Sequence, residues 1–416
     1  MRRETDSRRS SGDWRIGQWL RGAVVAIAAL LPFVVWPGIE RPFSTPKIFL
    51  LGGFDIVAAG VAFSTGHFKW PSLPRGFQVS LIAWAGALGA SSLVGEFVSP
   101  QVVGVALCPL VWFVLVAGIQ PKPEHLAAGV VGACAGLSLI ALLQYSGLDP
   151  FRLLGWTTPA YGSPRMRVFG TLGNPNFVAA FLAGALPVSV VLRRWLSRRA
   201  LVALAIALPT AALLATGSRA GLLAATSLLI WLGIVRRFRG WRPIIAGVLV
   251  LLGLLPLMPA RALAPTLSGR LYIWRVTSSH LLERPLFGYG PGAFEAKFIE
   301  WETAYWREGR GSADQRQFAG LQAHAHNDYL EVLVDRGWVG LLSLLVLIAS
   351  FLVFAFQQTT RSPTGLMAAG SAGLVALATV AFVDFPLHRP TELCLFWTLI
   401  AVVYLEAEQR TSAAGS

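Results

Sequence analysis

The sequence has 416 residues, of which 55% are hydrophobic and only 13% are charged, and its mean hydropathy is +0.59. A soluble globular protein carries about 25% charged residues, so this composition excludes an ordinary soluble domain. The net charge of +14 does not indicate nucleic-acid binding, because the arginines are dispersed among apolar stretches rather than gathered on one soluble domain.

The chain begins with a polar, arginine-rich stretch, residues 1–17, followed by an apolar run. That run lacks a small-residue cleavage site, so we expect a retained first span rather than a cleaved signal peptide. The cysteines, Cys108, Cys134 and Cys394, all lie inside apolar runs without metal-ligand spacing. We interpret them as small packing residues.

Apolar windows long enough to cross a bilayer recur along the chain. They predict an all-α polytopic membrane protein with about twelve transmembrane helices. The windows lie near residues 18–37, 47–64, 77–95, 100–119, 124–145, 176–193, 199–216, 219–235, 243–258, 337–356, 364–383 and 391–406.

The orientation follows from the short loops. Arginine clusters fill 193–199 and 236–242, whereas the opposite short loops 37–46 and 95–101 carry only Arg41. The positive-inside rule then predicts that both termini are cytoplasmic. The expected division is a cytoplasmic tail 1–17, helices 1–9 within 18–258, a periplasmic loop 259–336, helices 10–12 within 337–406, and a cytoplasmic tail 407–416.

The predicted periplasmic loop between helices 9 and 10 is far longer than a hairpin needs, and loops of that length are usually functional or disordered. It mixes aromatic and charged residues rather than being of low complexity. We therefore expect it to be partly helical and to fold against the bundle. A second long connection, 146–175, is predicted on the same side.

The first polar motif, residues 169–177, contains glycines and an Asn-Pro pair, which are typical of a chain reversal. A turn does not explain the other polar groups at this membrane edge, Arg165, Arg167, Asn174 and Asn176. We treat these four residues as candidates for substrate binding.

The second motif, residues 216–221, places Arg219 between two apolar runs with almost no loop around it. An ionisable residue so close to the hydrocarbon indicates function. The alternative is an arginine that snorkels to lipid phosphates. The small residues on both sides favour function, because they let a substrate approach closely.

The third motif places Arg270 and Trp274 four residues apart, on one face of an expected interfacial helix. A cation–π pair is a sufficient structural reason for this spacing, and a phosphate-binding arginine is the functional one.

The fourth motif, residues 285–294, is a glycine-rich turn rather than a nucleotide loop, since no strand precedes it.

The fifth motif, residues 323–331, carries His324, His326 and Asn327 just before Asp328 and Glu331. The two acids have the form of a helix cap with its capping-box partner. His326 would then face the bundle, with His324 and Asn327 as supporting groups. A separation of two residues disfavours zinc binding by the histidines.

The last outer loop, 384–390, adds a polar edge without an assigned use.

Together these groups suit one type of chemistry. Arginine forks match the oxygens of a lipid diphosphate, and a histidine can take a proton from a sugar hydroxyl. These residues together therefore predict the transfer of a group from a lipid diphosphate to an alcohol. Arginines would stabilise the leaving charge in place of a metal, and no cofactor is expected.

These motifs carry a resemblance to a family. The order Gly170 to Asn176, Gly217 to Gly221, Arg270 with Trp274, Gly288 to Gly292, and His326-Asn327 with Leu330 resembles the O-antigen ligase family. That family shares its core with Wzy-type O-antigen polymerases and bacterial protein O-oligosaccharyltransferases. The resemblance runs from about Gly170 to Gly340, and the first five spans match only in hydropathy.

The resemblance implies a metal-independent, inverting glycosyltransferase of the bacterial inner membrane, with its active site facing the periplasm. It would move a glycan from undecaprenyl diphosphate to lipid A–core in lipopolysaccharide biosynthesis. By the same resemblance His326 is the catalytic histidine, and Arg219 and Arg270 bind the diphosphate.

Three alternatives stay open. A polymerase of O-antigen or exopolysaccharide, or a protein O-oligosaccharyltransferase, would use the same donor and site with another acceptor. A transporter of lipid-linked glycan would need charges deep inside several spans, whereas these spans are nearly free of charge. A scaffold would not need Arg219 where it is.

Overall fold

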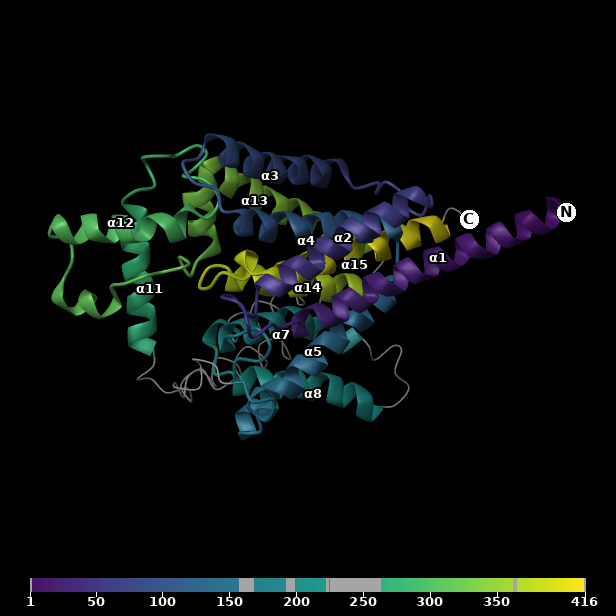
Figure 1. The fold of residues 1–416 in the computed structure, drawn as a ribbon, viewed down its shortest axis with the longest axis horizontal. Coiled ribbons are helices and arrows are strands. Elements are labelled where there is room, and N and C mark those ends of the chain that lie inside the picture. Colours follow the sequence, from purple (N-terminus) through teal and green to yellow (C-terminus); the bar gives the residue numbers. More distant parts are fainter. Residues whose placement is uncertain are drawn as a thin grey trace.

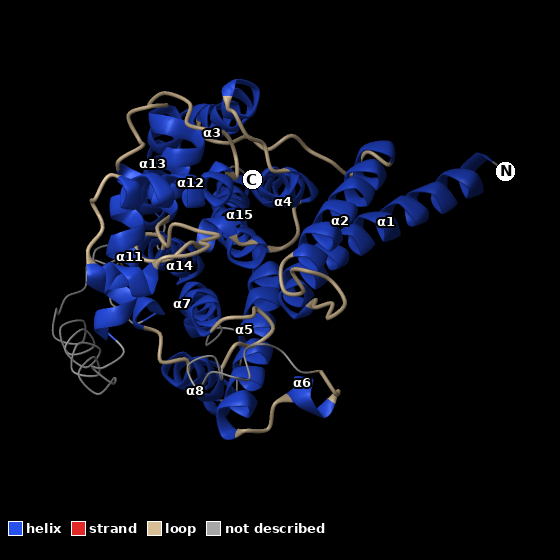
Figure 2. Ribbon diagram, turned by 60° about the vertical axis from the view of Figure 1, so that its left-hand side comes forward, coloured by secondary structure: helices blue, strands red, loops and turns tan. Residues whose placement is uncertain are grey.

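The computed structural model describes residues 2–156, 168–191, 199–221, 224, 263–361 and 365–414. In this part of the chain every regular element is a helix (Figure 2). The α-helices are α1 (Arg2–Leu30), α2 (Thr45–Ser64), α3 (Arg75–Val94), α4 (Pro100–Ile119), α5 (Pro123–Ser146), α6 (Pro150–Leu153), α7 (Pro175–Val191), α8 (Arg199–Ala215), α11 (Leu263–Ser278), α12 (Ala293–Arg307), α13 (Asp328–Arg361), α14 (Gly365–Val380) and α15 (Pro390–Ala414). Short 3₁₀ turns are η1 (Leu31–Phe33), η6 (Ala313–Phe318) and η7 (Pro386–His388).

Among the described residues, 7 helices are long and apolar enough to cross a membrane, and three shorter apolar helices accompany them. The protein is therefore a polytopic helical membrane protein. The helices coincide with all the predicted windows except 219–235 and 243–258, which lie almost wholly outside the described residues. The predicted number of twelve spans stays a prediction.

Proline sets the start of several helices. Pro100, Pro123, Pro175 and Pro390 are the first residues of α4, α5, α7 and α15. Proline suits this position because its fixed φ is helical and the missing N–H has no partner in the first turn. At the other end of α5, Gly147 ends the helix with a φ of 91°, the left-handed conformation that favours glycine.

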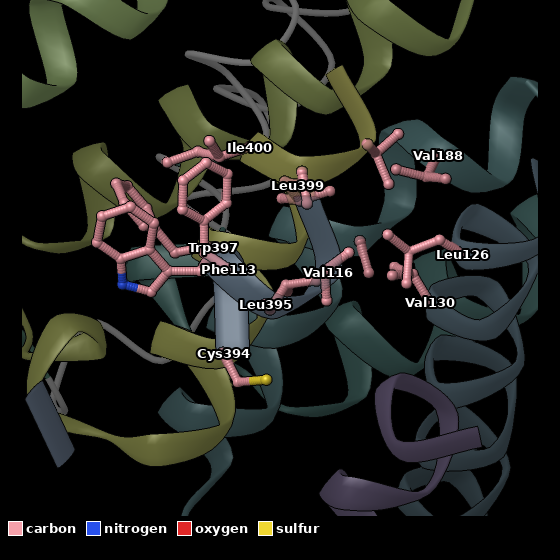
Figure 3. Close-up of a cluster of buried hydrophobic side chains, with 14 of the residues drawn as sticks. Phe113, Val116, Leu126, Val130, Val188, Cys394, Leu395, Trp397, Leu399 and Ile400 are labelled. Atoms are coloured by element: carbon pink, nitrogen blue, oxygen red, sulfur yellow. The ribbon is translucent and has the colours of Figure 1, made fainter. Parts of the chain in front are cut away.

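Helix α15 is the centre of the bundle, and nearly all of it is buried. Figure 3 shows its side chains, Trp397 among them, meeting Phe113 of α4, Val130 of α5 and Val188 of α7. The Trp112 indole also donates a 2.9 Å hydrogen bond to Thr398 Oγ1 of α15. Lipid tails are as apolar as leucine, so packing and interhelical hydrogen bonds of this kind hold membrane helices together.

Close approach between α7 and α14 depends on small residues. A Cβ added at Gly373 would lie 2.2 Å from the carbonyl oxygen of Gly184. Helices in bilayers use such small residues to bring their backbones together. This contact fixes the end of α14, from which the chain continues into the 381–389 loop.

Helices α11 and α12 project beyond one end of the bundle, and both chain termini lie at the opposite end (Figure 1). Their facing side chains form a separate aromatic cluster that includes Tyr272, Phe298 and Trp301. In the described part of the stretch before α13, these two helices are the α-helical elements.

Helix α13 begins at Asp328, nine residues before the predicted span, and kinks at Gly337, where φ is 63°. Residues 285–289 are hydrogen-bonded to the backbone on both sides of the kink: Trp338 N donates to Pro285 O at 2.8 Å, and Tyr289 N donates to Val334 O at 2.9 Å. A Cβ on Gly337 would lie 2.3 Å from the Leu286 carbonyl. The glycine is therefore required both by the backbone angle and by this close contact.

The glycine-rich turn 288–292 is a structural link, as its composition predicts. Gly290 N donates to Asp335 O at 2.9 Å, and Phe97 N donates to Tyr289 O at 3.1 Å. The Asp335 carboxylate accepts from Gly292 N at 2.8 Å. The turn thus lies between the first half of α13 and the loop that joins α3 to α4.

Replacing Gly290 with alanine tests this link. A Cβ there would lie 1.9 Å from the carbonyl oxygen of Phe97, so we expect G290A to lose more than about 4 kcal/mol of stability or to fail to fold. The matched control is G309A, whose φ of +71° is also left-handed but whose Cβ meets nothing within 4 Å. It should lose only about 1–2 kcal/mol. Thermal melting in detergent that gave equal losses would show that the turn is not sterically locked.

Candidate active site

Ala325, the residue between the two histidines, is held through both its backbone C=O and its backbone N–H. The Trp274 indole of α11 donates to Ala325 O at 2.8 Å, and Ala325 N donates to Glu331 Oε2 at 2.8 Å. Ala325 itself is fully buried. This double attachment fixes the flanking residues, and His326 adopts a φ of 51°. Left-handed backbone at a non-glycine residue is strained and is concentrated at functional sites.

Both histidines contact the ring of Phe385, which comes from the loop between α14 and α15. The His324 ring stacks on it with 3.9 Å between centroids, and the His326 ring meets it edge-on at 5.2 Å. The Arg389 guanidinium also lies 4.9 Å from the centre of the same ring. One aromatic side chain therefore brings together two histidines and a buried arginine.

His326 has an acidic neighbour in Asp384. Its Nδ1 lies 3.7 Å from Asp384 Oδ1, within ion-pair distance but longer than a hydrogen bond. Arg389 Nη1 donates to the same oxygen at 3.4 Å. Burial alone would raise the pKa of the Asp384 carboxyl, but the charge of Arg389, followed by His326 and Arg270, outweighs it and holds this pKa below its usual value. Asp384 is thus an anion that can orient His326.

His324 also has an acidic partner. Its Nδ1 lies 2.8 Å from Glu331 Oε1, and its side chain is 23% exposed. The Glu331 carboxylate is buried, and its Oε1 also lies 3.8 Å from His388 Nε2, within ion-pair distance. His388 Nδ1 then meets Asp328 Oδ1. Imidazoles and carboxylates therefore alternate in one chain of contacts, in the order His324, Glu331, His388 and Asp328.

The prediction that Asp328 and Glu331 cap α13 is wrong. Asn327 is the cap, since its side-chain oxygen accepts from Leu330 N at 3.0 Å. Asp328 instead accepts from Leu387 N at 2.7 Å and pairs with His388. Both acids are buried, and a buried carboxylate is retained only with cationic or hydrogen-bonding partners. Spacing alone could not show that histidines from distant segments supply them.

His388 carries a positive charge near neutral pH. Burial disfavours its charged form, but the carboxylates of Glu331 and Asp328 outweigh burial and raise the pKa of His388 to about 9. The folded pKa exceeds the ordinary value of 6.5. The stabilisation is therefore fully present below pH 6.5 and is lost as the pH rises through about 9.

Thermal melting between pH 6 and 9.5 checks this pairing. The protein should lose stability steadily above about pH 7. H388Q should be destabilised by about 3–5 kcal/mol at pH 6.5, because it leaves the buried Asp328 carboxylate without its cation. It should also lose most of the pH dependence. H125Q, at an exposed position, should follow the unmodified protein; an unchanged pH profile in H388Q would contradict the assignment.

Arg219 is the first helical residue after the turn that ends α8, and its side chain is half-buried. The next residue, Ala220, packs in one buried cluster with Ala180 of α7 and Val380 of α14. The carbonyl of Val380 accepts from Asp384 N at 2.8 Å. The Arg219 segment is therefore anchored next to the residues that begin the 381–389 loop.

Arg270 lies on α11, and its electrostatic partner is Asp384. Burial lowers the pKa of Arg270 from its ordinary value, while the charge of Asp384 acts in the opposite direction. An arginine remains protonated despite such a shift. Trp274, four residues on, uses its indole N–H to hold the Ala325 carbonyl. The structure thus gives Trp274 a positioning role in addition to its predicted role in binding.

The asparagines of the first motif act locally. Asn174 Oδ1 accepts from Asn176 N at 2.9 Å, and the Asn174 carbonyl accepts from the first turn of α7. Lys47, which is fully buried, donates to Thr171 O at 2.9 Å and ties this turn to α2. Arg165 and Arg167 lie outside the described residues.

Sequence analysis missed most of the loop 384–390. Asp384, Phe385, His388 and Arg389 all contact the candidate site, yet the sequence showed only a polar edge. The available signal was the concentration of acid, histidine and arginine between two apolar runs, which is unusual at a membrane boundary. What it lacked was any sign that this loop pairs with residues 324–331.

This geometry places two histidines, a buried acid and an arginine at one end of a membrane bundle. The model of the family described as O-antigen ligase matches residues 203–345. The resemblance to the O-antigen ligase family is confirmed. The matched stretch contains Arg219, Arg270, His324 and His326, whereas Asp384 and Arg389 follow it.

Two curated proteins are similar to parts of the chain. "Putative polysaccharide ligase RC0486" of Rickettsia conorii is 28% identical over 97 residues, which cover 22% of this chain and 21% of that protein. "Exopolysaccharide production protein ExoQ" of Rhizobium meliloti is 27% identical over 157 residues, which cover 36% of this chain and 33% of that protein. The chain thus spans well under two thirds of either relative. With the O-antigen ligase match, they support a membrane protein of the polysaccharide ligase and polymerase family.

Proposed function

We propose that this protein transfers a glycan from undecaprenyl diphosphate to an acceptor hydroxyl, and that the product is O-antigen joined to lipid A–core. The observation that carries the proposal is the pairing of His326 with the buried Asp384, within reach of Arg389 and Arg270. The O-antigen ligase match over residues 203–345 supports the substrate class.

In the proposed mechanism His326 is the general base. It takes the proton from the acceptor hydroxyl while that oxygen attacks the anomeric carbon of the glycan. The bond from this carbon to the diphosphate oxygen breaks, and the lipid diphosphate leaves with the electron pair. Attack opposite the leaving group inverts the anomeric configuration. Asp384 stabilises the imidazolium that forms, as a buried carboxylate does beside a catalytic histidine.

The leaving diphosphate gains negative charge during this step. Arg219 and Arg270 are the cations proposed to bind it, with Arg165 and Arg167 as further predicted contacts. Arginine matches phosphate oxygens with two parallel N–H donors and stays charged near a membrane. Cations that are already in place stabilise charge developing in the transition state. The proposed reaction therefore proceeds without a metal or a cofactor.

We further propose the predicted topology of about twelve spans in the bacterial inner membrane, with both termini cytoplasmic and the site facing the periplasm. In support, the termini lie at the end of the bundle opposite α11 and α12 (Figure 1). Trp274 of α11 contacts the histidine segment. The site and the predicted periplasmic stretch 259–336 are thus at one end.

Substitution of His326 is the direct test of the mechanism. H326A should lower kcat by about 10²–10⁴-fold, the usual contribution of a general base, with the donor KM nearly unchanged. The assay uses purified protein, lipid-linked donor and EDTA. The control H280A changes a histidine that lies outside the candidate site and pairs with Glu283. Full activity in H326A, or loss of wild-type activity in EDTA, would refute the mechanism.

The arginines should show a different pattern. R219A should abolish transfer, and R270A should weaken it, because each removes positive charge from the leaving diphosphate. R275A, an exposed arginine on the same helix as Arg270, should behave as unmodified protein. Equal effects of R270A and R275A on kcat would mean that α11 contributes only general positive charge.

A polymerase is the second candidate, because one relative is named for exopolysaccharide production. Both reactions use the same donor and leaving group and differ only in the acceptor. Offering lipid A–core, free repeat units and a protein acceptor in turn separates them. Product formed only with lipid A–core would support the ligase, and product formed only with repeat units would support the polymerase.

A further inference from the structure

A cavity of about 340 Å³ has Phe385 in its wall, the residue whose ring both histidines contact. Its wall includes His324, Gln101, Phe177 and Arg389, while His326 is not part of it. Ligand pockets commonly have volumes of about 300–1,000 Å³, so the cavity can hold a small polar group such as a sugar. The Phe385 ring therefore borders both this cavity and the proposed base.

The charges around the cavity argue against a diphosphate. Three carboxylates line it, those of Glu295, Glu331 and Glu392. The cations in the wall are already neutralised: Arg41 lies 2.6 Å from Glu295, and Arg389 Nε lies 2.8 Å from Glu392. A diphosphate placed here would meet these carboxylates, and both arginines of the wall are already paired with two of them. The donor's leaving group therefore belongs with Arg219 and Arg270, outside this cavity.

The same lining suits sugar hydroxyls. Arg389 and Glu392 are 6% and 1% exposed. Arg389 Nη2 has no hydrogen-bond partner among the described residues, and the ion pair of Arg389 Nε with Glu392 Oε1 leaves both of these atoms without a hydrogen bond. A hydroxyl both donates and accepts, so adjacent hydroxyls can satisfy a guanidinium and a carboxylate that lie side by side. The rings of Phe177 and Phe385 offer apolar surface for the C–H face of a sugar.

We propose that this cavity binds the sugar residue that carries the acceptor hydroxyl, and that the acceptor is therefore a glycan rather than a protein side chain. This inference rests on the proposed glycosyl transfer. The sugar is held by Arg389, Glu392 and Gln101 next to Phe385, so that its nucleophilic hydroxyl extends past the ring edge to His326. The His324–Glu331 pair forms the wall nearest to the base.

Binding can be measured without turnover by cysteine protection. Ala323 is exposed and lines the cavity, so A323C in a C108S background should react with a maleimide. The control L321C lies two residues away, at a position that is 86% exposed and outside the lining. Four probes are added without donor: core oligosaccharide, repeat-unit oligosaccharide, undecaprenyl diphosphate and a serine-rich peptide.

We expect one of the oligosaccharides to slow labelling at residue 323 but not at residue 321. Protection by the core oligosaccharide identifies a ligase acceptor, and protection by the repeat unit a polymerase acceptor. Protection only by undecaprenyl diphosphate, only by the peptide, or by none of the probes overturns the proposal. Because no transfer occurs in this measurement, its result is independent of whether the proposed catalytic mechanism holds.

A kinetic split provides the second test. Q101L removes one hydrogen-bonding group of the cavity and should raise the acceptor KM about fivefold, the equivalent of about 1 kcal/mol. The donor KM and kcat should stay within about twofold of the unmodified protein. Q78L, at an exposed position on α3, is the control. A rise in the donor KM instead of the acceptor KM would assign the cavity to the donor.

Discussion

The candidate site depends on one constraint: acidic groups buried at the end of a membrane bundle must be paired. Asp328, Glu331 and Asp384 are all within a few per cent of full burial. Their partners are His388, His324 and Arg389, which come from two segments separated by about fifty residues of sequence. Removing one partner of a buried ion pair typically costs about 3–5 kcal/mol. The Asp328–His388 pair, together with the longer Glu331–His388 and Asp384–His326 contacts, therefore joins the start of α13 to the loop between α14 and α15.

The bundle beneath the site provides a rigid support of a different kind. The contact between Gly184 and Gly373 and the Trp112–Thr398 hydrogen bond hold α7, α14, α4 and α15 by close packing rather than by exclusion of water. Because α14 and α15 flank the 381–389 loop, their packing determines where Asp384 and Phe385 lie. The surroundings of the proposed base thus depend on helix contacts in the middle of the bundle.

Much of the fold could be predicted from sequence, because spanning a bilayer imposes a length and a composition that single windows reveal. The start of α13 and its kink could not, since Gly337 owes its conformation to a docking segment about fifty residues earlier. For the candidate site, His326, Arg219 and Arg270 were predicted from local patterns, and their roles stay predictions. Asp384 and Arg389 were not, because pairing between distant loops leaves no periodicity. The misassigned caps, Asp328 and Glu331, show the same limit: spacing identifies a possible cap but not a competing partner.

The position of Phe385 has a consequence for how such a protein can diversify. The ring has no charge and no exchangeable proton, so it can contact both the proposed base and the cavity without exchanging a proton with either. Side chains such as Gln101, on the recognition side, can change without altering the pairing of His326 with Asp384. Proteins that share this arrangement could therefore acquire new partners for the same bond-forming step through substitutions confined to the wall of the cavity.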